Sequence, residues 1–427
     1  ERCLFHTTVE ETRWDEDASR WTIKTDRGDA MKARFVVLAN GILTTPKLAR
    51  IDGMESFKGD AFHTSRWNYH VDLKDKRVGV IGTGATAVQI IPEIAKEVKD
   101  LYVFQRTPST IDVRDQRETT DEEAQRWLNE PGWAVARRER LATISAGRTA
   151  LKANDDFLSG KIDHVTAPKV HATQLSPEKL IERQLNTNFR IMEQIRGRVD
   201  SVVDDPEIAE LLKPYYAYGC KRPTFHDQYL PAFNRPNVHL VDTAPAGVSN
   251  INETGVVHDG VDYPLDVLIY ATGFQWMETS TFNMVTGPGG RTLNSKWKEE
   301  GTKTFLGMHS AGFPNLLIMT GPQGGGGQFN FTRVCEMHAT YVTWMLTEMR
   351  DGGFDTVDVK SESEEEYAEH CREMDLLSQP LRDCYSYYNG DGSAQPGSLA
   401  YYGGGDRWHQ RRKAAQASLD PYIFKSE

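Results

Sequence analysis

The chain has 427 residues, which corresponds to two or three domains at roughly 150 residues each. Hydrophobic residues make up 39% and charged residues 26%, and this balance excludes a disordered or fibrous protein. The formal net charge of −11 argues against a nucleic-acid or membrane-surface partner, and no run approaches the roughly 20 apolar residues of a membrane span. Five scattered cysteines without CxxC spacing predict neither a disulfide framework nor a metal site, and they favour a reducing, cytoplasmic compartment.

The first forty residues predict a β-meander. Residues 7–12 and 20–25 alternate apolar and polar side chains, and turn-rich segments follow each of them. The apolar run 35–39 is typical of a buried parallel strand. It ends at Asn40 and Gly41, as such a strand does when it stops beside a ligand.

A glycine-rich turn follows the second apolar strand, residues 76–81, and opens a helix-compatible stretch before a third strand at 101–104. In the pattern Gly82-x-Gly84-x-x-Ala87, the first glycine permits a tight turn, the second lets the backbone approach a pyrophosphate, and Ala87 allows close helix packing. The helix N-terminus then favours the anion. The alternative is a glycine turn without a ligand. The candidate dinucleotide-binding residues are Gly82, Thr83, Gly84, Ala85, Thr86, Ala87 and Gln89.

The end of the third strand indicates which dinucleotide is bound. A site for NAD needs an acidic residue about 20 residues after the first glycine, to bind the ribose 2′-hydroxyl. Here the strand is followed by Arg106 and Thr107. An arginine suits a 2′-phosphate, because it can make a bidentate charged contact with it. We therefore favour an NADP(H) site over the alternative that Arg106 is an ordinary surface residue.

Charged, helix-favouring residues follow, and they predict a helical insertion over about 114–213. Strand signals resume at 238–241 and continue through a second meander that ends at Thr272 and Gly273. This ending echoes the earlier strand that stops at Gly41. The echo suggests two related nucleotide-binding units.

The C-terminal part contains one long helix candidate, from Asn330 to about Arg350. Four consecutive glycines, 324–327, precede it and indicate either a mobile loop or a close approach of the backbone to a ligand. The glutamate-rich run 362–366 is interpreted as a solvated helix face.

The segment Phe57-x-Gly59-x-x-x-His63-x-x-x-Trp67 matches the fingerprint of Baeyer–Villiger monooxygenases, and the chain resembles this flavoprotein family over nearly its whole length. Related flavin monooxygenases that oxidise nitrogen and sulfur usually carry Tyr or Phe in place of Trp67. By its own chemistry His63 also fits a core histidine. Further segments that resemble the family are 103–108, 219–222, 237–243, 271–274 and 312–316.

The resemblance implies an α/β flavoprotein with Rossmann-like FAD and NADP domains and the helical insertion. Residues 1–50 would be part of the FAD domain, 51–258 the NADP domain, and 259–427 the rest of the FAD domain with the active-site loops. The family's N-terminal GxGxxG turn and its aromatic segment with an active-site Asp have no counterpart here. We therefore expect an N-terminally truncated enzyme that binds FAD poorly on its own.

The resemblance also assigns roles to residues. Lys221 would hold the NADP 2′-phosphate, and Arg222 would face the flavin, stabilise the peroxyflavin and contact the nicotinamide. An aromatic run, 215–218, leads into this pair and can desolvate it. His63 and Trp67 join Arg222 as catalytic candidates. The other cofactor-binding candidates are Val9, Gly41, Thr272, Gly273, Asn330, Phe331 and Tyr387.

The implied activity is NADPH- and O2-dependent oxygen insertion beside a ketone carbonyl, through a C4a-peroxyflavin, to give an ester or lactone. Its partners would be a small-molecule ketone and O2. Two alternatives stay open: oxygenation of nitrogen or sulfur by a related flavin monooxygenase, and a non-catalytic NADP(H)-binding fragment.

Overall fold

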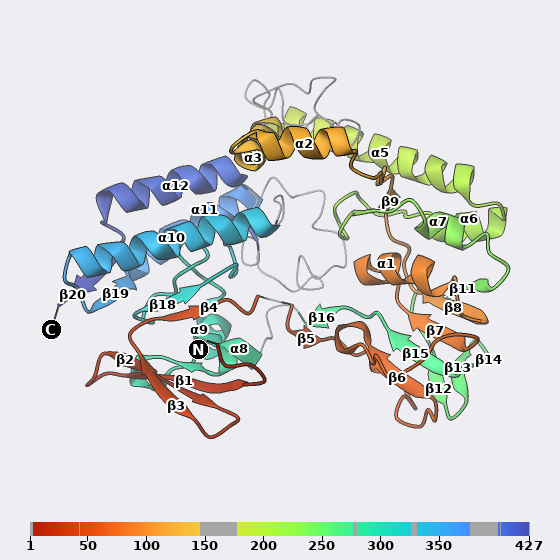
Figure 1. Cartoon of the computed structure of the whole chain (residues 1–427), viewed down its shortest axis with the longest axis horizontal. Coiled ribbons are helices and arrows are strands. Elements are labelled where there is room, and N and C mark those ends of the chain that lie inside the picture. Colours follow the sequence, from red (N-terminus) through yellow and green to blue (C-terminus); the bar gives the residue numbers. More distant parts are fainter. Residues whose placement is uncertain are drawn as a thin grey trace. The chain divides into compact units, whose positions relative to one another are not determined.

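The structure of the chain is a computed structural model (Figure 1). It describes residues 3–41, 43–145, 177–275, 280–325, 331–375, 400–401 and 403–426. The chain divides into two compact units. The first combines Glu1–Thr45 with Gln275–Glu427, and the second is Pro46–Phe274. The short strands β5 (Thr45–Pro46) and β16 (Phe274–Gln275) contain the two points where the chain passes between the units.

A five-stranded parallel sheet forms the centre of the second unit, in the order β11-β8-β7-β15-β6. The side chains of its middle strands are apolar on both faces, because a parallel sheet is covered on both sides. Helix α1 (Ala85–Ile94) joins β7 to β8 and completes the expected βαβ unit. The strands are β6 (Asp60–His63), β7 (Arg77–Ile81), β8 (Asp100–Gln105), β11 (Val238–Asp242) and β15 (Val267–Tyr270).

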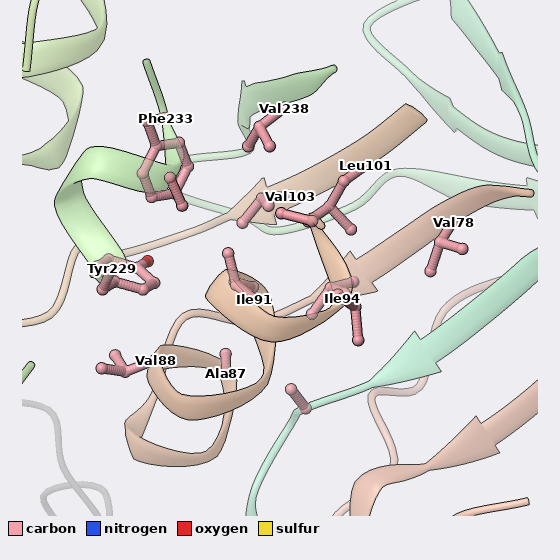
Figure 2. Packing of buried hydrophobic residues seen from close by; sticks show 14 of the residues in the cluster. Val78, Ala87, Val88, Ile91, Ile94, Leu101, Val103, Tyr229, Phe233 and Val238 are labelled. Carbon is pink, nitrogen blue, oxygen red and sulfur yellow. The ribbon is translucent and has the colours of Figure 1, made fainter. Parts of the chain in front are cut away.

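Helix α1 packs on one face of this sheet (Figure 2). Ala87 and Ile91 are fully buried and lie one helical turn apart, so they present one apolar face towards Leu101 and Val103 of β8. Tyr229 from α7 (Tyr229–Ala232) joins the same cluster. Full burial of a large apolar side chain such as Ile91 contributes about 1.5–3 kcal/mol. The packing therefore fixes the first turn of α1 at the carboxyl end of β7.

The rest of the second unit surrounds the sheet. The described part of the expected insertion is helical, with a capping box between Thr120 and Glu123 at its first helix and Asp205 capping its last. Its helices are α2 (Asp121–Asn129), α3 (Trp133–Ser145), α5 (Pro177–Val202) and α6 (Pro206–Leu212). The smaller elements are η1 (Thr64–Arg66), β9 (Ile111–Asp112), β10 (Thr224–Phe225), β12 (Asn250–Asn252), β13 (Gly255–His258) and β14 (Val261–Pro264).

The second unit extends beyond the expected boundary at residue 258. Strand β15 pairs in parallel register with β7 on one side and β6 on the other. These two ladders place it inside the sheet, and the unit therefore ends at Phe274. The strand that closes the second meander belongs to the same sheet as the glycine-rich turn.

The first unit is built from both ends of the chain. The expected meander forms a four-stranded sheet in the order β17-β1-β2-β3, and the expected strand at 35–39 pairs in parallel with β18. Its strands are β1 (Val9–Asp15), β2 (Arg20–Thr25), β3 (Ala30–Ala33), β4 (Val36–Leu38), β17 (Val285–Thr286), β18 (Leu316–Ile318), β19 (Thr356–Val359) and β20 (Tyr422–Lys425). Its helices are α8 (Ser280–Asn283), η4 (Pro288–Gly290), α9 (Leu293–Glu300), α10 (Phe331–Asp351), α11 (Ser361–Asp375) and α12 (Gly405–Ser418).

The glutamate-rich run is not a uniformly solvated helix face. Glu364 in α11 is 3% exposed, and its Oε2 lies 2.6 Å from Nζ of the equally buried Lys296. The same carboxylate accepts the backbone N–H of Ala311 at 2.8 Å. Glu364 shares the inner face of α11 with Tyr367 and Cys371, at helical spacing. The expectation was wrong for this residue because an acidic side chain occupies a core position.

Asp358 in β19 gives a testable pH dependence. It accepts the backbone N–H groups of Gly312 and Val359, and burial raises its pKa from 3.8 to about 6. The folded protein therefore binds this proton more tightly than the unfolded chain, so its contribution to the unfolding free energy falls as pH rises from about 4 to about 6. We expect Asp358→Asn to gain stability relative to the parent across this window, measured as urea midpoints at several pH values. Exposed Asp351, whose pKa Arg350 lowers, is the control, and Asp351→Asn should show no such gain.

The described cysteines depart in one place from the expected free thiols. Cys220 forms a disulfide, whereas Cys3, Cys335 and Cys371 are free. Within the described ranges, no helix has both the length and the apolarity needed to cross a bilayer, and no cluster of His, Cys, Asp or Glu side chains has the geometry to hold a metal ion.

Candidate functional site

The glycine-rich turn lies at the carboxyl end of β7, where the chain order of the sheet reverses. From β7 the chain continues outward to β8 and β11, and β15 then lies on the opposite side of β7. In open α/β sheets such a switch point leaves a crevice for a ligand. The turn is therefore placed where a dinucleotide binds.

The two glycines of the turn have different surroundings. Gly82 has φ +109, and a Cβ at this position would lie 2.6 Å from the carbonyl oxygen of Ala271. Gly84 is the N-cap of α1, no side chain caps the helix there, and a Cβ would meet no heavy atom within 4 Å. A pyrophosphate needs this open approach to free backbone N–H groups. The residues present fit the phosphates of a dinucleotide.

Side-chain hydrogen bonds hold the turn against the end of β8. The Thr83 hydroxyl donates to the carbonyl oxygen of Thr107 at 2.7 Å, and the Ser109 hydroxyl donates to the carbonyl oxygen of Thr83 at 2.5 Å. Sequence reasoning selected Thr83 and Thr107 and missed Ser109, although its position two residues after Thr107 is a usable signal. Exposed Gln89 donates its side-chain amide to Ala85 of the same helix at 2.9 Å.

Two cationic residues are connected to the segment that follows β8. Arg106 is exposed and passes beside Gly247 of the loop that follows β11. Lys221 lies over the ring of Tyr216, with Nζ 5.8 Å from the ring centroid. The Tyr216 hydroxyl donates to the carbonyl oxygen of Pro108 at 2.9 Å, and burial raises the pKa of Tyr216. This tyrosine therefore links the lysine to the segment that begins with Arg106.

His63 connects the fingerprint segment to the closing strand. Its Nδ1 accepts the backbone N–H of Ser65 at 3.1 Å, so its Nε2 carries the proton and donates to the carbonyl oxygen of Gly273 at 3.0 Å. Burial lowers the pKa of His63. The Gly273 carbonyl also accepts the N–H of Lys47, and the Thr272 hydroxyl donates to the carbonyl of Lys47. Both ring nitrogens of His63 thus hold backbone in place.

Trp67 of the fingerprint lies at the edge of the hydrophobic core. Trp67 packs edge to face on Phe62, with ring centroids 5.1 Å apart, and is partly buried against the cluster that contains α1. Arg222 is exposed on the segment between Lys221 and β10. The structure therefore places the glycine turn beside Thr107 at the carboxyl end of β8, and Tyr216 connects Lys221 to Pro108 of the same segment.

The remaining candidates lie in the first unit or outside the described residues. Gly41 follows β4 with φ +74, and a Cβ there would meet nothing within 4 Å. Val9 begins β1, and Phe331 is the first residue of α10 and is 49% exposed. Asn330 and Tyr387 lie outside the described residues.

Side chains anchor the described start of the glycine-rich run, for which the sequence predicts either a mobile loop or a close approach of the backbone to a ligand. His338 of α10 is fully buried; its Nδ1 accepts the N–H of Thr320 at 3.0 Å and its Nε2 donates to the carbonyl of Gly324 at 3.0 Å. Burial lowers the pKa of His338 to about 4, which keeps the imidazole neutral in this role. The Tyr367 hydroxyl donates to the carbonyl of Gln323 at 2.8 Å.

Comparison with known proteins identifies the family. Residues 3–119 match the model of the flavin-binding monooxygenase-like family. The chain is 37% identical over 98% of its length to a Baeyer–Villiger monooxygenase, ATR8, of Stachybotrys chlorohalonatus, and spans 71% of that protein. Its fold matches a polycyclic ketone monooxygenase of Thermothelomyces thermophila with a TM-score of 0.87 at 32% identity, over 99% of this chain and 74% of that one.

A third comparison bears on the cofactors. The structure of OTEMO in complex with FAD and NADP matches with a TM-score of 0.81 at 28% identity, over 99% of this chain and 81% of that one. This match agrees with the two related nucleotide-binding units that the sequence echo suggests. The chain belongs to the Baeyer–Villiger monooxygenases, flavin-dependent oxidoreductases that use FAD and NADPH.

Proposed function

We propose that this protein inserts one atom of O2 beside the carbonyl group of a bulky, apolar ketone. The product is an ester or lactone, the second oxygen atom leaves as water, and NADPH supplies the two electrons. When bound, FAD supplies the transfer of these electrons to O2. The bulky substrate is supported by the likeness to a polycyclic ketone monooxygenase. One observation supports the binding of NADPH in this reaction. The backbone at Gly84 is open to a ligand, and the turn is hydrogen-bonded to Thr107, which follows Arg106.

The residues of the second unit divide the binding of NADPH between them. Backbone N–H groups at the start of α1 bind the pyrophosphate, which approaches over Gly84. Arg106 and Lys221 hold the 2′-phosphate. The Arg222 guanidinium is a cationic hydrogen-bond donor, and it stabilises the negative charge that develops during oxygen transfer.

The roles of the other candidates follow from their contacts. We assign His63 to positioning, because both of its ring nitrogens hold backbone groups. Trp67 supports the same segment through Phe62. On the FAD side we propose contacts from Val9, Gly41, Asn330 and Phe331, and for Tyr387 a contact near the nicotinamide. Thr272 and Gly273 end the closing strand of the NADPH-binding unit.

Removing either cation proposed to hold the 2′-phosphate should reduce the preference for NADP(H) over NAD(H). We expect Arg106→Ala and Lys221→Ala each to weaken NADPH binding about 10- to 100-fold, since each removes a charge-assisted contact of about 1.5–3 kcal/mol. Binding of NADH, which lacks the phosphate, should change little. Titration calorimetry with NADP+ and NAD+ measures both. Lys99→Ala, a charge removal outside this pair of cations, is the control. Equal losses for the two nucleotides would contradict the assignment.

The oxygenation itself is tested on the full-length gene product with NADPH, FAD and ¹⁸O2. A polycyclic ketone and an aromatic thioether are offered separately. We expect one ¹⁸O atom in an ester or lactone product, seen by mass spectrometry, and NADPH consumption that depends on the ketone. Exclusive formation of the sulfoxide would contradict the proposed reaction, as would NADPH binding without any oxygen consumption.

The proposed setting is cytoplasmic, and the proposed partners are a ketone, O2 and the two cofactors. Three free thiols among the described cysteines support a reducing compartment, whereas the disulfide at Cys220 does not.

A further inference from the structure

The segment that carries Lys221 and Arg222 runs directly into a very short β-ribbon. Strand β10 begins at Thr224 and pairs in parallel with β9 over two residues. Thr224 donates both its N–H and its hydroxyl to the carbonyl oxygen of Thr110, at 3.1 and 2.6 Å. A ribbon of this length is not stable by itself. Its position must therefore be fixed by contacts from elsewhere.

Arg198 of α5 supplies one such contact downstream of the cation pair. Its guanidinium donates to the carbonyl oxygen of Ile111 in β9 at 2.8 Å and to that of His226, just after β10, at 3.1 Å. One planar, rigid guanidinium therefore connects β9 with the end of β10. Asp227 closes the same end, because its carboxylate accepts the backbone N–H groups of three successive residues, 114–116, at 2.9–3.0 Å.

Asn188 of the same helix supplies the contact upstream of the pair. Its side-chain amide donates to the carbonyl oxygen of Tyr218 at 3.0 Å, and its Oδ1 accepts the N–H of Tyr218 at 2.8 Å. Both backbone groups of this residue are therefore held by one side chain. Helix α5 is therefore hydrogen-bonded to the chain on both sides of residues 219–223, at Tyr218 and at His226.

We propose that Asn188 and Arg198 are positioning residues for the cation pair Lys221–Arg222, so that α5 of the helical insertion sets the geometry of the NADPH site. The proposal rests on the proposed function of this pair in binding the nucleotide. Neither residue needs to touch the cofactor. Their effect is to confine a segment that has only a two-residue strand of its own.

The test combines binding and hydrogen exchange in the 427-residue chain. We expect Arg198→Ala and Asn188→Ala each to raise the dissociation constant of NADP+ about tenfold, the value of one lost charge-assisted or paired hydrogen bond. Amides of residues 217–226 should exchange about tenfold faster without nucleotide. Arg198→Lys, which reaches a single carbonyl, should fall between the parent and the alanine variant and covers the case in which alanine prevents folding. Exposed Arg190 on the same helix gives the control variant Arg190→Ala.

The outcomes separate the two levels of the proposal. If the parent chain does not prefer NADP+ over NAD+, the proposed function of the pair fails. If the parent shows this preference but Arg198→Ala and Asn188→Ala leave both affinity and amide exchange unchanged, the positioning role is wrong. Faster exchange with unchanged affinity also overturns it, because the segment would then bind equally well when loosened. Loss of affinity together with faster exchange supports it.

Discussion

Replacing Gly82 by alanine is expected to destabilise the second unit and to abolish measurable NADP+ binding. The backbone there has φ +109, a region that costs a residue with a side chain about 1–3 kcal/mol. The added Cβ would also lie 2.6 Å from the carbonyl oxygen of Ala271, the residue that follows β15. Relief of this clash must move the turn or the strand. Thermal unfolding and calorimetry measure the two losses.

Gly84→Ala is the matched control because it separates the two effects. Gly84 has φ −72, which alanine adopts without strain, and its Cβ would enter open space. Stability should fall by at most about 1 kcal/mol, since alanine is only a poorer N-cap. Affinity for NADP+ should still drop at least about tenfold, because the methyl group occupies the approach of the pyrophosphate. A Gly84→Ala chain that binds NADP+ like the parent would place the nucleotide elsewhere.

The second large effect is expected at the buried pair Lys296–Glu364. Lys296 donates to the carboxylate at 2.6 Å, to Ser310 at 3.0 Å and to the carbonyl of Ala311 at 2.8 Å. Burial raises the pKa of Glu364, and the lysine offsets part of this rise. Lys296→Met leaves a buried carboxylate without its cation, which costs about 3–5 kcal/mol. Urea unfolding at pH 7 measures the loss.

Three comparisons give this prediction its specificity. The variant should be less destabilised at pH 4 than at pH 7, because an unpaired buried carboxylate takes up a proton more readily in the folded state. Adding Glu364→Gln, which has no charge and keeps an acceptor for Ala311, should recover most of the loss. Lys96→Met breaks an exposed pair with Glu93 and should cost less than about 1 kcal/mol. A loss at Lys296 as small as that at Lys96 would refute the argument.

The sequence pattern was sufficient to predict elements whose signals lie within one short stretch of the chain. The strand, the glycine turn and the helix from Arg77 to Ile94 were predicted because the turn chemistry and the apolar runs are contiguous. The meanders followed from alternation and turn residues in the same way. Such signals arise from contacts within about thirty residues, which a reading along the chain detects.

Other features depend on contacts between distant residues, and the pattern misled or was silent. Glu364 appeared solvated among other glutamates, because its partner Lys296 lies 68 residues earlier. The four glycines left both a mobile loop and a close approach to a ligand open, because the residue that anchors Gly324 is His338 in the following helix. The grip of Arg198 on Ile111 spans 87 residues. No periodicity records these pairings, since each joins side chains from separate elements.

The discontinuous first unit has a consequence for how the protein is made. The indole N–H of Trp21 donates to the carbonyl of Pro314, which lies 293 residues later in the chain. Strand β1 likewise pairs in parallel with β17, which is synthesised much later. The continuous second unit emerges from the ribosome whole before these partners exist. Since chains fold as they are synthesised and distant pairings form slowly, the second unit should fold first and the first unit last. Residues 46–274 can therefore complete their fold before the two halves of the first unit are both available to pair.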